Sequence, residues 1–165
     1  MTESAPVTVG SHFWLRRIHS LSGIVPIFFH GIYGLFITST AQPNPISNLY
    51  VRNAMYFLQR ATGVIVFAFI LFHLWTTRLV QIQDHESLDL FRQVQAAVRN
   101  PWIYAFYIAG ILSATFHLAN GLWSFAIVWG LTVGPKAQRR MMYLSAAVFV
   151  LLSYLGVASL QAFRL

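Results

Sequence analysis

Four apolar stretches separated by short polar segments dominate this chain. They cover about Ile18–Thr38, Ala54–Leu79, Trp102–Leu131 and Met141–Phe163. Each has the roughly 20 residues that a helix needs to cross the hydrocarbon core of a bilayer. The alternation of apolar and polar residues that marks a membrane β-barrel strand is not visible. The pattern therefore predicts an all-α transmembrane helix bundle.

The polar segments predict where the helices end. Residues 41–48 contain two prolines, and residues 133–140 read VGPKAQRR, so we expect a loop at each. Acidic residues gather between the second and third stretches, at Asp84, Glu86 and Asp89. We expect a short amphipathic helix around them.

Composition supports a membrane protein, because 57% of residues are apolar and only 9% are charged, against about 25% charged in a soluble domain. We expect a single domain over residues 1–165, with 1–11 as a disordered tail. The net charge of +7 does not indicate nucleic acid, because the basic residues flank apolar stretches instead of forming one patch. The absence of cysteine excludes disulfides and iron–sulfur clusters held by this chain.

The basic residues also predict orientation. Three groups lie beside the apolar stretches: Arg16 and Arg17, Arg52 and Arg60, and Lys136, Arg139 and Arg140. The positive-inside rule places all three groups on the cytoplasmic side and the acidic segment outside. The first stretch would then begin and end inside, although about 21 residues cross the membrane only once. It is re-entrant with a bend near Pro26, or its N-terminus is outside, or the chain lacks a loop and parts of two helices.

Three histidines lie within separate apolar stretches, at His30, His73 and His117. An imidazole in a bilayer is costly and is therefore a candidate functional residue. It is also the commonest metal ligand and a ligand of haem iron. From helical rise, His30 and His117 lie about 15 and 21 Å from the cytoplasmic ends of their stretches, and His73 about 31 Å. His30 and His117 are thus candidates to share one iron, and His73 lies farther out.

The neighbours of these histidines leave alternatives open. Small residues share a helix face with His117, at Gly110, Ser113, Ala114 and Gly121. That flat face could receive a macrocycle, or it could let helices pack closely. His73 shares its face with bulkier side chains and could instead bond a neighbouring helix. His12 and His19 are expected at the membrane surface, where His19 could meet a quinone or a propionate.

Several functions are disfavoured by what the apolar stretches lack. They contain no carboxylate and no lysine, so they offer neither a buried carboxylate proton relay nor a retinal Schiff base. A phosphate-binding loop and a nucleophile motif are also missing. A pump, a photoreceptor and a hydrolase are therefore disfavoured, and a bundle that holds a cofactor between helices remains.

The segments LQRATG and FHLANGLWSFAIVWGLTV are long and specific, and FWLRRIHSLSGIVP and HGIYGLFI add to them. Through them the chain resembles the cytochrome b subunit (b558 type) of succinate:menaquinone oxidoreductases, relatives of the fumarate reductase cytochrome b. The resemblance implies five transmembrane helices and two haems b held by four histidines. It also implies a flavoprotein subunit and an iron–sulfur subunit on the cytoplasmic side of a bacterial membrane.

By this resemblance, His30 and His117 hold the proximal haem, and His73 is one ligand of the distal haem. The family's fourth ligand would lie in a stretch that this chain lacks, because GIVPI runs directly into FFHGIYG. If the chain is whole, we expect one haem and a bend near Pro26. If a stretch is missing, we expect two haems, five helices and a backbone break between about Pro26 and Phe29.

We therefore interpret the chain as a haem b anchor, with no succinate-oxidising site of its own, between an iron–sulfur subunit and menaquinone in the bilayer. Candidates for propionate or quinone contacts are Arg16, Arg17, His19, Arg60 and Arg139, although the arginines could instead be solvated residues that set topology. The alternatives are an anchor for another respiratory enzyme, such as a hydrogenase, and a haem-free scaffold or transporter.

Overall fold

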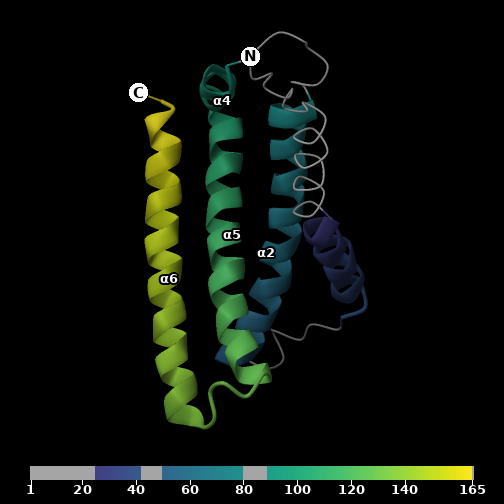
Figure 1. The fold of residues 1–165 in the computed structure, drawn as a ribbon, viewed down its shortest axis with the longest axis vertical. Helices are drawn as coiled ribbons and strands as arrows, with labels where there is room; N and C mark the ends of the chain where they lie inside the picture. Colours follow the sequence, from purple (N-terminus) through teal and green to yellow (C-terminus); the bar gives the residue numbers. More distant parts are fainter. Residues whose placement is uncertain (1–24, 42–49, 80–88, 165) are drawn as a thin grey trace, which may run out of the picture. The chain divides into compact units, whose positions relative to one another are not determined.

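The computed structural model describes residues 25–41, 50–79 and 89–164, and all regular elements in these ranges are helical (Figure 1). The labelled elements are α2 (Val51–Leu74), the π-helical turn η1 (Trp75–Leu79), α4 (Leu90–Val98), α5 (Pro101–Val128) and α6 (Pro135–Ala162). A further apolar helix covers Val25–Ser39. The prediction of an all-α bundle is confirmed.

The chain forms two compact units, Met1–Thr40 and Ala41–Leu165. The first contributes the Val25–Ser39 helix, which is continuous through Pro26 and Phe29. Whether a stretch is missing between about Pro26 and Phe29 remains a prediction. The expected tail, Arg16, Arg17 and His19 lie outside the described residues, as does any bend before Val25.

The second unit contains three helices long and apolar enough to cross a membrane. They cover Val51–Thr77, Pro101–Val128 and Pro135–Ala162, with 27, 28 and 28 residues. At 1.5 Å per residue each spans about 40 Å, more than the roughly 30 Å of a hydrocarbon core. The chain is therefore a multi-pass membrane protein.

Capping residues determine where these helices begin. The side chain of Asp89 accepts from the backbone N–H of Phe91 at 3.0 Å, so α4 begins directly after Asp89. Asp84 and Glu86, around which a short helix was expected, lie outside the described residues. Asn100 caps α5 in the same way, with Pro101 in the first turn. Both satisfy N–H groups that a helix start leaves unpaired.

The prediction of a loop over residues 133–140 is wrong, because helix α6 begins at Pro135 and includes Lys136, Arg139 and Arg140. Proline at the first helical position already has the backbone angle of a helix and lacks only an N–H that would be unpaired. The connection from α5 is therefore short, Trp129–Gly134, and contains two glycines with left-handed backbone, Gly130 (φ 69°) and Gly134 (φ 86°).

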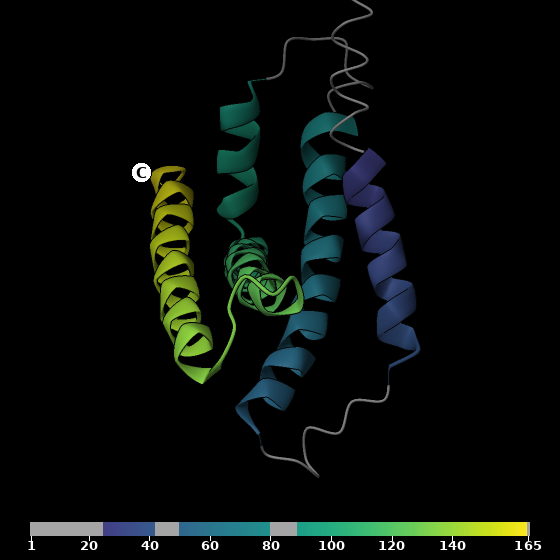
Figure 2. The same ribbon diagram turned by 60° about the horizontal axis from the view of Figure 1, so that its bottom comes forward.

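Helix α5 lies between α2 and α6 and packs against both (Figures 1 and 2). Its contacts with α2 run from Asn120–Met55 at one end to Tyr107–His73 at the other, so the two helices are antiparallel. Helix α6 is antiparallel to α5, with Thr115 and Ser153 hydroxyls 2.8 Å apart. Six of the nine buried residues among the described part of the unit belong to α5, which therefore positions the site.

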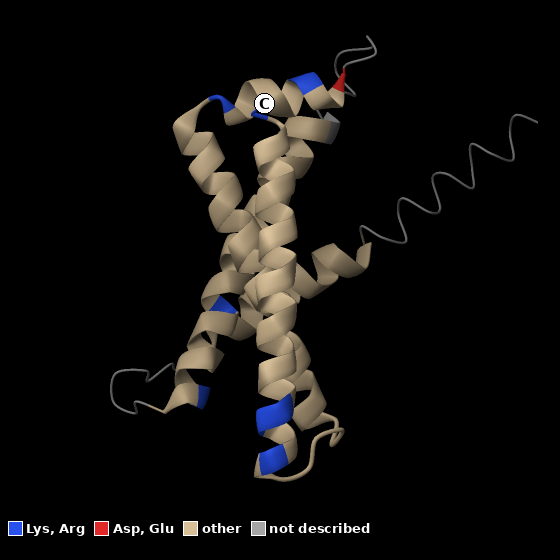
Figure 3. Cartoon of the chain, turned by 90° about the vertical axis from the view of Figure 1, so that its left-hand side faces the viewer, with Lys and Arg blue, Asp and Glu red and all other residues tan. Residues whose placement is uncertain are grey.

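Apart from Arg60, the described charged residues of this unit stand near its two ends (Figure 3). One end carries the basic residues at the starts of α2 and α6, where the Arg52 guanidinium donates to the side chain of Gln138. The other carries Arg92, Arg99 and Arg164, together with Asp89. The cytoplasmic location of the first end remains a prediction.

Candidate functional site

His117 of α5 points toward α2 and is held there by a hydrogen bond. Its Nδ1 lies 3.0 Å from the backbone oxygen of Gln59. Because a carbonyl oxygen only accepts hydrogen bonds, Nδ1 carries the proton and the lone pair is on Nε2. Donation from one ring nitrogen to a backbone carbonyl is the usual arrangement of a histidine whose other nitrogen ligates a metal.

Gly63 lets the His117 ring approach the backbone of α2. A Cβ atom at Gly63 would lie 3.0 Å from Cε1 and 3.4 Å from Nδ1 of His117. Such contacts are tighter than side chains normally make, so a larger residue would push the ring outward. The glycine thus makes room for the imidazole one helical turn beyond Gln59.

Amide side chains join α2 and α5 at the same level. Gln59 Nε2 donates to the backbone oxygen of His117 at 3.1 Å, and Gln59 Oε1 accepts from Asn120 Nδ2 at 2.7 Å. Asn120 is buried and also donates to the backbone oxygen of Met55 at 3.2 Å. Gln59, Asn120 and Gly63 were not predicted as site residues from the sequence. The two amides within apolar stretches were a signal for Gln59 and Asn120.

Arg60 places a cation well inside α2. It lies nine residues after Val51, about 13 Å along the helix. Its guanidinium carbon sits 4.0 Å from the centre of the Tyr56 ring, and its Nη1 is buried without a hydrogen-bond partner among the described residues. A buried guanidinium N–H without an acceptor fits a carboxylate such as a propionate. Arg139, by contrast, is exposed on α6.

His73 lies apart from His117. Its Nδ1 is 3.3 Å from the Tyr107 hydroxyl, and its ring stacks on Phe69 with centroids 5.9 Å apart. Tyr107 precedes His117 by ten residues on α5, about 15 Å of helix. The two histidines therefore cannot bind the same iron, in agreement with the depths expected from the sequence. The bond to Tyr107 is the interhelical contact weighed as an alternative for His73.

The small residues near His117 mainly serve helix packing. A Cβ at Gly110 would lie 2.4 Å from ring atoms of Phe69 on α2, and one at Gly121 would lie 3.5 Å from Gln59 Nε2. The flat face of α5 that was considered for a macrocycle is thus covered by α2 at Gly110 and Gly121. Close packing, the alternative considered, explains Gly110.

His30 belongs to the Val25–Ser39 helix of the first unit, where its side chain is exposed. Its pairing with His117 joins the two units and remains a prediction. Within the described ranges, no group of three or more His, Asp or Glu side chains could hold a bare metal ion.

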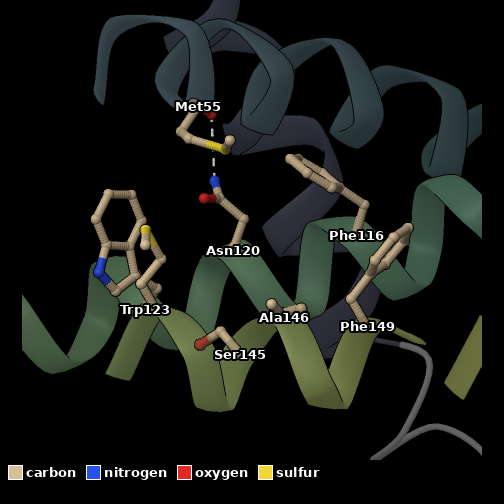
Figure 4. A pocket seen from close by; sticks show the side chains of 9 residues that line it. Met55, Phe116, Asn120, Trp123, Ser145, Ala146 and Phe149 are labelled. Atoms are coloured by element: carbon tan, nitrogen blue, oxygen red, sulfur yellow. Dashed lines mark hydrogen bonds between the residues drawn. The ribbon is translucent and has the colours of Figure 1, made fainter. Parts of the chain in front are cut away.

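A cavity of about 150 Å³ lies between α2, α5 and α6 (Figure 4). Its lining is almost wholly apolar and comprises Met55, Phe116, Ala119, Asn120, Trp123, Met142, Ser145, Ala146 and Phe149. The buried Ser145 hydroxyl has no hydrogen-bond partner among the described residues. The cavity adjoins the Gln59–Asn120 bond through Asn120, whereas His117 is not among its lining residues.

Comparison with known proteins finds a family profile and a relative. Residues 45–156 match the family profile described as succinate dehydrogenase/fumarate reductase transmembrane subunit. The chain is also similar to the succinate dehydrogenase cytochrome b558 subunit of Bacillus subtilis (strain 168), with 40% identity over 140 residues, which is 84% of this chain and 68% of that relative. No solved structure matches.

Proposed function

Because the chain belongs to the succinate dehydrogenase/fumarate reductase transmembrane subunit family, we propose that it is the haem b membrane anchor of such a complex. In this role it carries electrons between an iron–sulfur subunit and a quinone in the bilayer. The haem supplies a one-electron carrier, and the protein supplies its ligands, its orientation and its electrostatic surroundings.

The observation that carries the proposal is the hydrogen bond from His117 Nδ1 to the Gln59 carbonyl oxygen. The bond places the proton on Nδ1 and the lone pair on Nε2, the nitrogen that would ligate haem iron. Arg60 adds a buried N–H without an acceptor one residue along α2, where a haem carboxylate would be stabilised. The described residues therefore fit the group.

The remaining ligands and partners follow from the sequence. His30 would be the second ligand of the same iron, whereas His73 would ligate a second haem only if another residue supplied the other ligand. A flavoprotein subunit, an iron–sulfur subunit and menaquinone would complete the electron path. The name of the relative, a cytochrome b558 subunit of succinate dehydrogenase, supports a haem and an assembly with other subunits.

A redox difference spectrum tests the proposal. The chain is expressed with its partner subunits, and the reduced-minus-oxidised spectrum and the haem-to-protein ratio are measured for His30→Ala, His117→Ala and a His73→Ala control. The first two variants should lose the same b-type component, while the control keeps it. An intact spectrum and ratio in His117→Ala would refute the proposal.

A further inference from the structure

We infer that Gln59 and Gly63 of α2 are positioning residues, which fix the orientation and the donor strength of the His117 imidazole. This inference rests on the proposed haem function. It concerns two residues that bind no cofactor themselves and act only through His117. The evidence lies wholly within the second unit, in contacts between α2 and α5.

Gln59 holds His117 at two places. Its backbone oxygen accepts from the ring at 3.0 Å, and its side-chain amide donates to the backbone oxygen of the same histidine at 3.1 Å. The other end of the amide is fixed by Asn120 Nδ2 at 2.7 Å. The Gln59 side chain therefore fixes the backbone of His117, and with it the ring, relative to the Gln59 carbonyl on α2.

Gly63 sets the distance between the ring and the helix. With a Cβ only 3.0 Å from Cε1, an alanine would move the imidazole away from α2 and stretch its bond to Gln59. A backbone carbonyl cannot follow the ring, because the helix fixes it in place. The short Nδ1–O distance therefore requires glycine one turn beyond Gln59.

The hydrogen bond matters for the histidine as a ligand. Donation from Nδ1 pushes electron density toward Nε2, which strengthens the ligand and favours ferric over ferrous iron. Such outer contacts typically change metal affinity 10–100-fold when removed. Weakening the bond should therefore loosen haem binding and raise the midpoint potential.

The experiment compares Gln59→Met and Gly63→Ala with Thr115→Val in the assembled complex. Gln59→Met keeps the side-chain length but removes both amide bonds. Thr115→Val removes the Thr115–Ser153 contact, another interhelical hydrogen bond of α5, but leaves the Gln59 and Gly63 contacts in place. Haem retention and the potentiometric midpoint of the component lost in His117→Ala are measured for each.

We expect both α2 variants to retain haem 10–100-fold less tightly and to show a raised midpoint potential. A tenfold loss of preference for ferric haem corresponds to 59 mV for one electron. Thr115→Val should keep the wild-type potential, since a loss of general stability does not move it. If Gly63→Ala does not assemble, Gln59→Met provides the test.

Wild-type retention and potential in Gln59→Met would overturn the positioning role. The proposed function would survive that result if His117→Ala still lost the spectral component. A raised potential in Thr115→Val of the same size would also overturn the inference, because any loosened helix contact would then suffice.

Discussion

Replacing Gly110 by alanine tests how closely α2 and α5 pack. The added Cβ would lie 2.4 Å from two ring atoms of Phe69 and 2.9 Å from a third. The ring cannot swing away easily, because it packs edge-on against Tyr107 and Phe106 with centroids 5.4 and 5.9 Å apart. Either the ring or the helices must therefore move.

The expected cost follows from two opposing terms. Overpacking a well-filled core typically costs about 1–3 kcal/mol, whereas alanine gains about 1 kcal/mol over glycine in a helix. Gly121→Ala on the same helix should gain the same free energy of helix formation. Its Cβ would make only an ordinary contact, 3.5 Å from Gln59 Nε2. The difference between the two variants therefore isolates the overpacking cost, about 1–3 kcal/mol with Gly110→Ala the less stable.

The free energy of unfolding is measured by SDS titration in mixed micelles, with Phe69→Leu added to the Gly110→Ala background. The smaller side chain should restore part of the lost stability, which a double-mutant cycle quantifies as a coupling between the two positions. Equal stability of Gly110→Ala and Gly121→Ala, or additive effects of Gly110→Ala and Phe69→Leu, would refute the packing argument.

Three further predictions concern charge, orientation and haem content. Arg60→Met should lower the midpoint potential, because a buried cation favours reduced haem, and Arg60→Lys should retain most of the effect; unchanged potentiometric titrations would contradict this role. In this cysteine-free chain, a cysteine replacing Lys136 should be labelled only from the cytoplasmic side and one replacing Trp102 only from the other, so labelling of both from one side would overturn the orientation. We expect one haem per chain of this sequence, retained in His73→Ala, and a pyridine haemochrome ratio of two would show that His73 finds a second ligand.

The long helices could be predicted from hydropathy, but not all their ends. The second and third apolar stretches agree with α2–η1 and α5 to within three residues. The start of α6 was placed six residues late, at Met141 instead of Pro135, because its first turns are basic. Hydropathy cannot distinguish a charged loop from a charged first turn of a helix. The Gly134–Pro135 pair was the better signal, because proline is favoured at the first position of a helix.

The separation of His73 from His117 was predictable because helical rise is the same in every helix. The roles of Gln59 and Gly63 were not, because they depend on the rotation and register of α2 against α5. A single sequence shows which residues share a face, but not which face meets which. The same limit applied to Gly110, whose space is filled by a phenylalanine from α2.

The short connection between α5 and α6 has a consequence for insertion into the membrane. Only Trp129–Gly134 separate the two helices, and three cations follow within the first turns of α6. Each Lys or Arg costs about 2.5–3.5 kcal/mol at the centre of a bilayer, so dragging this turn across would cost roughly 8–10 kcal/mol. This cost favours insertion of the two helices as one hairpin, with its turn kept at the membrane surface. The helix that carries His117 would then reach the bilayer with one neighbour already beside it, before any cofactor is needed to hold it there.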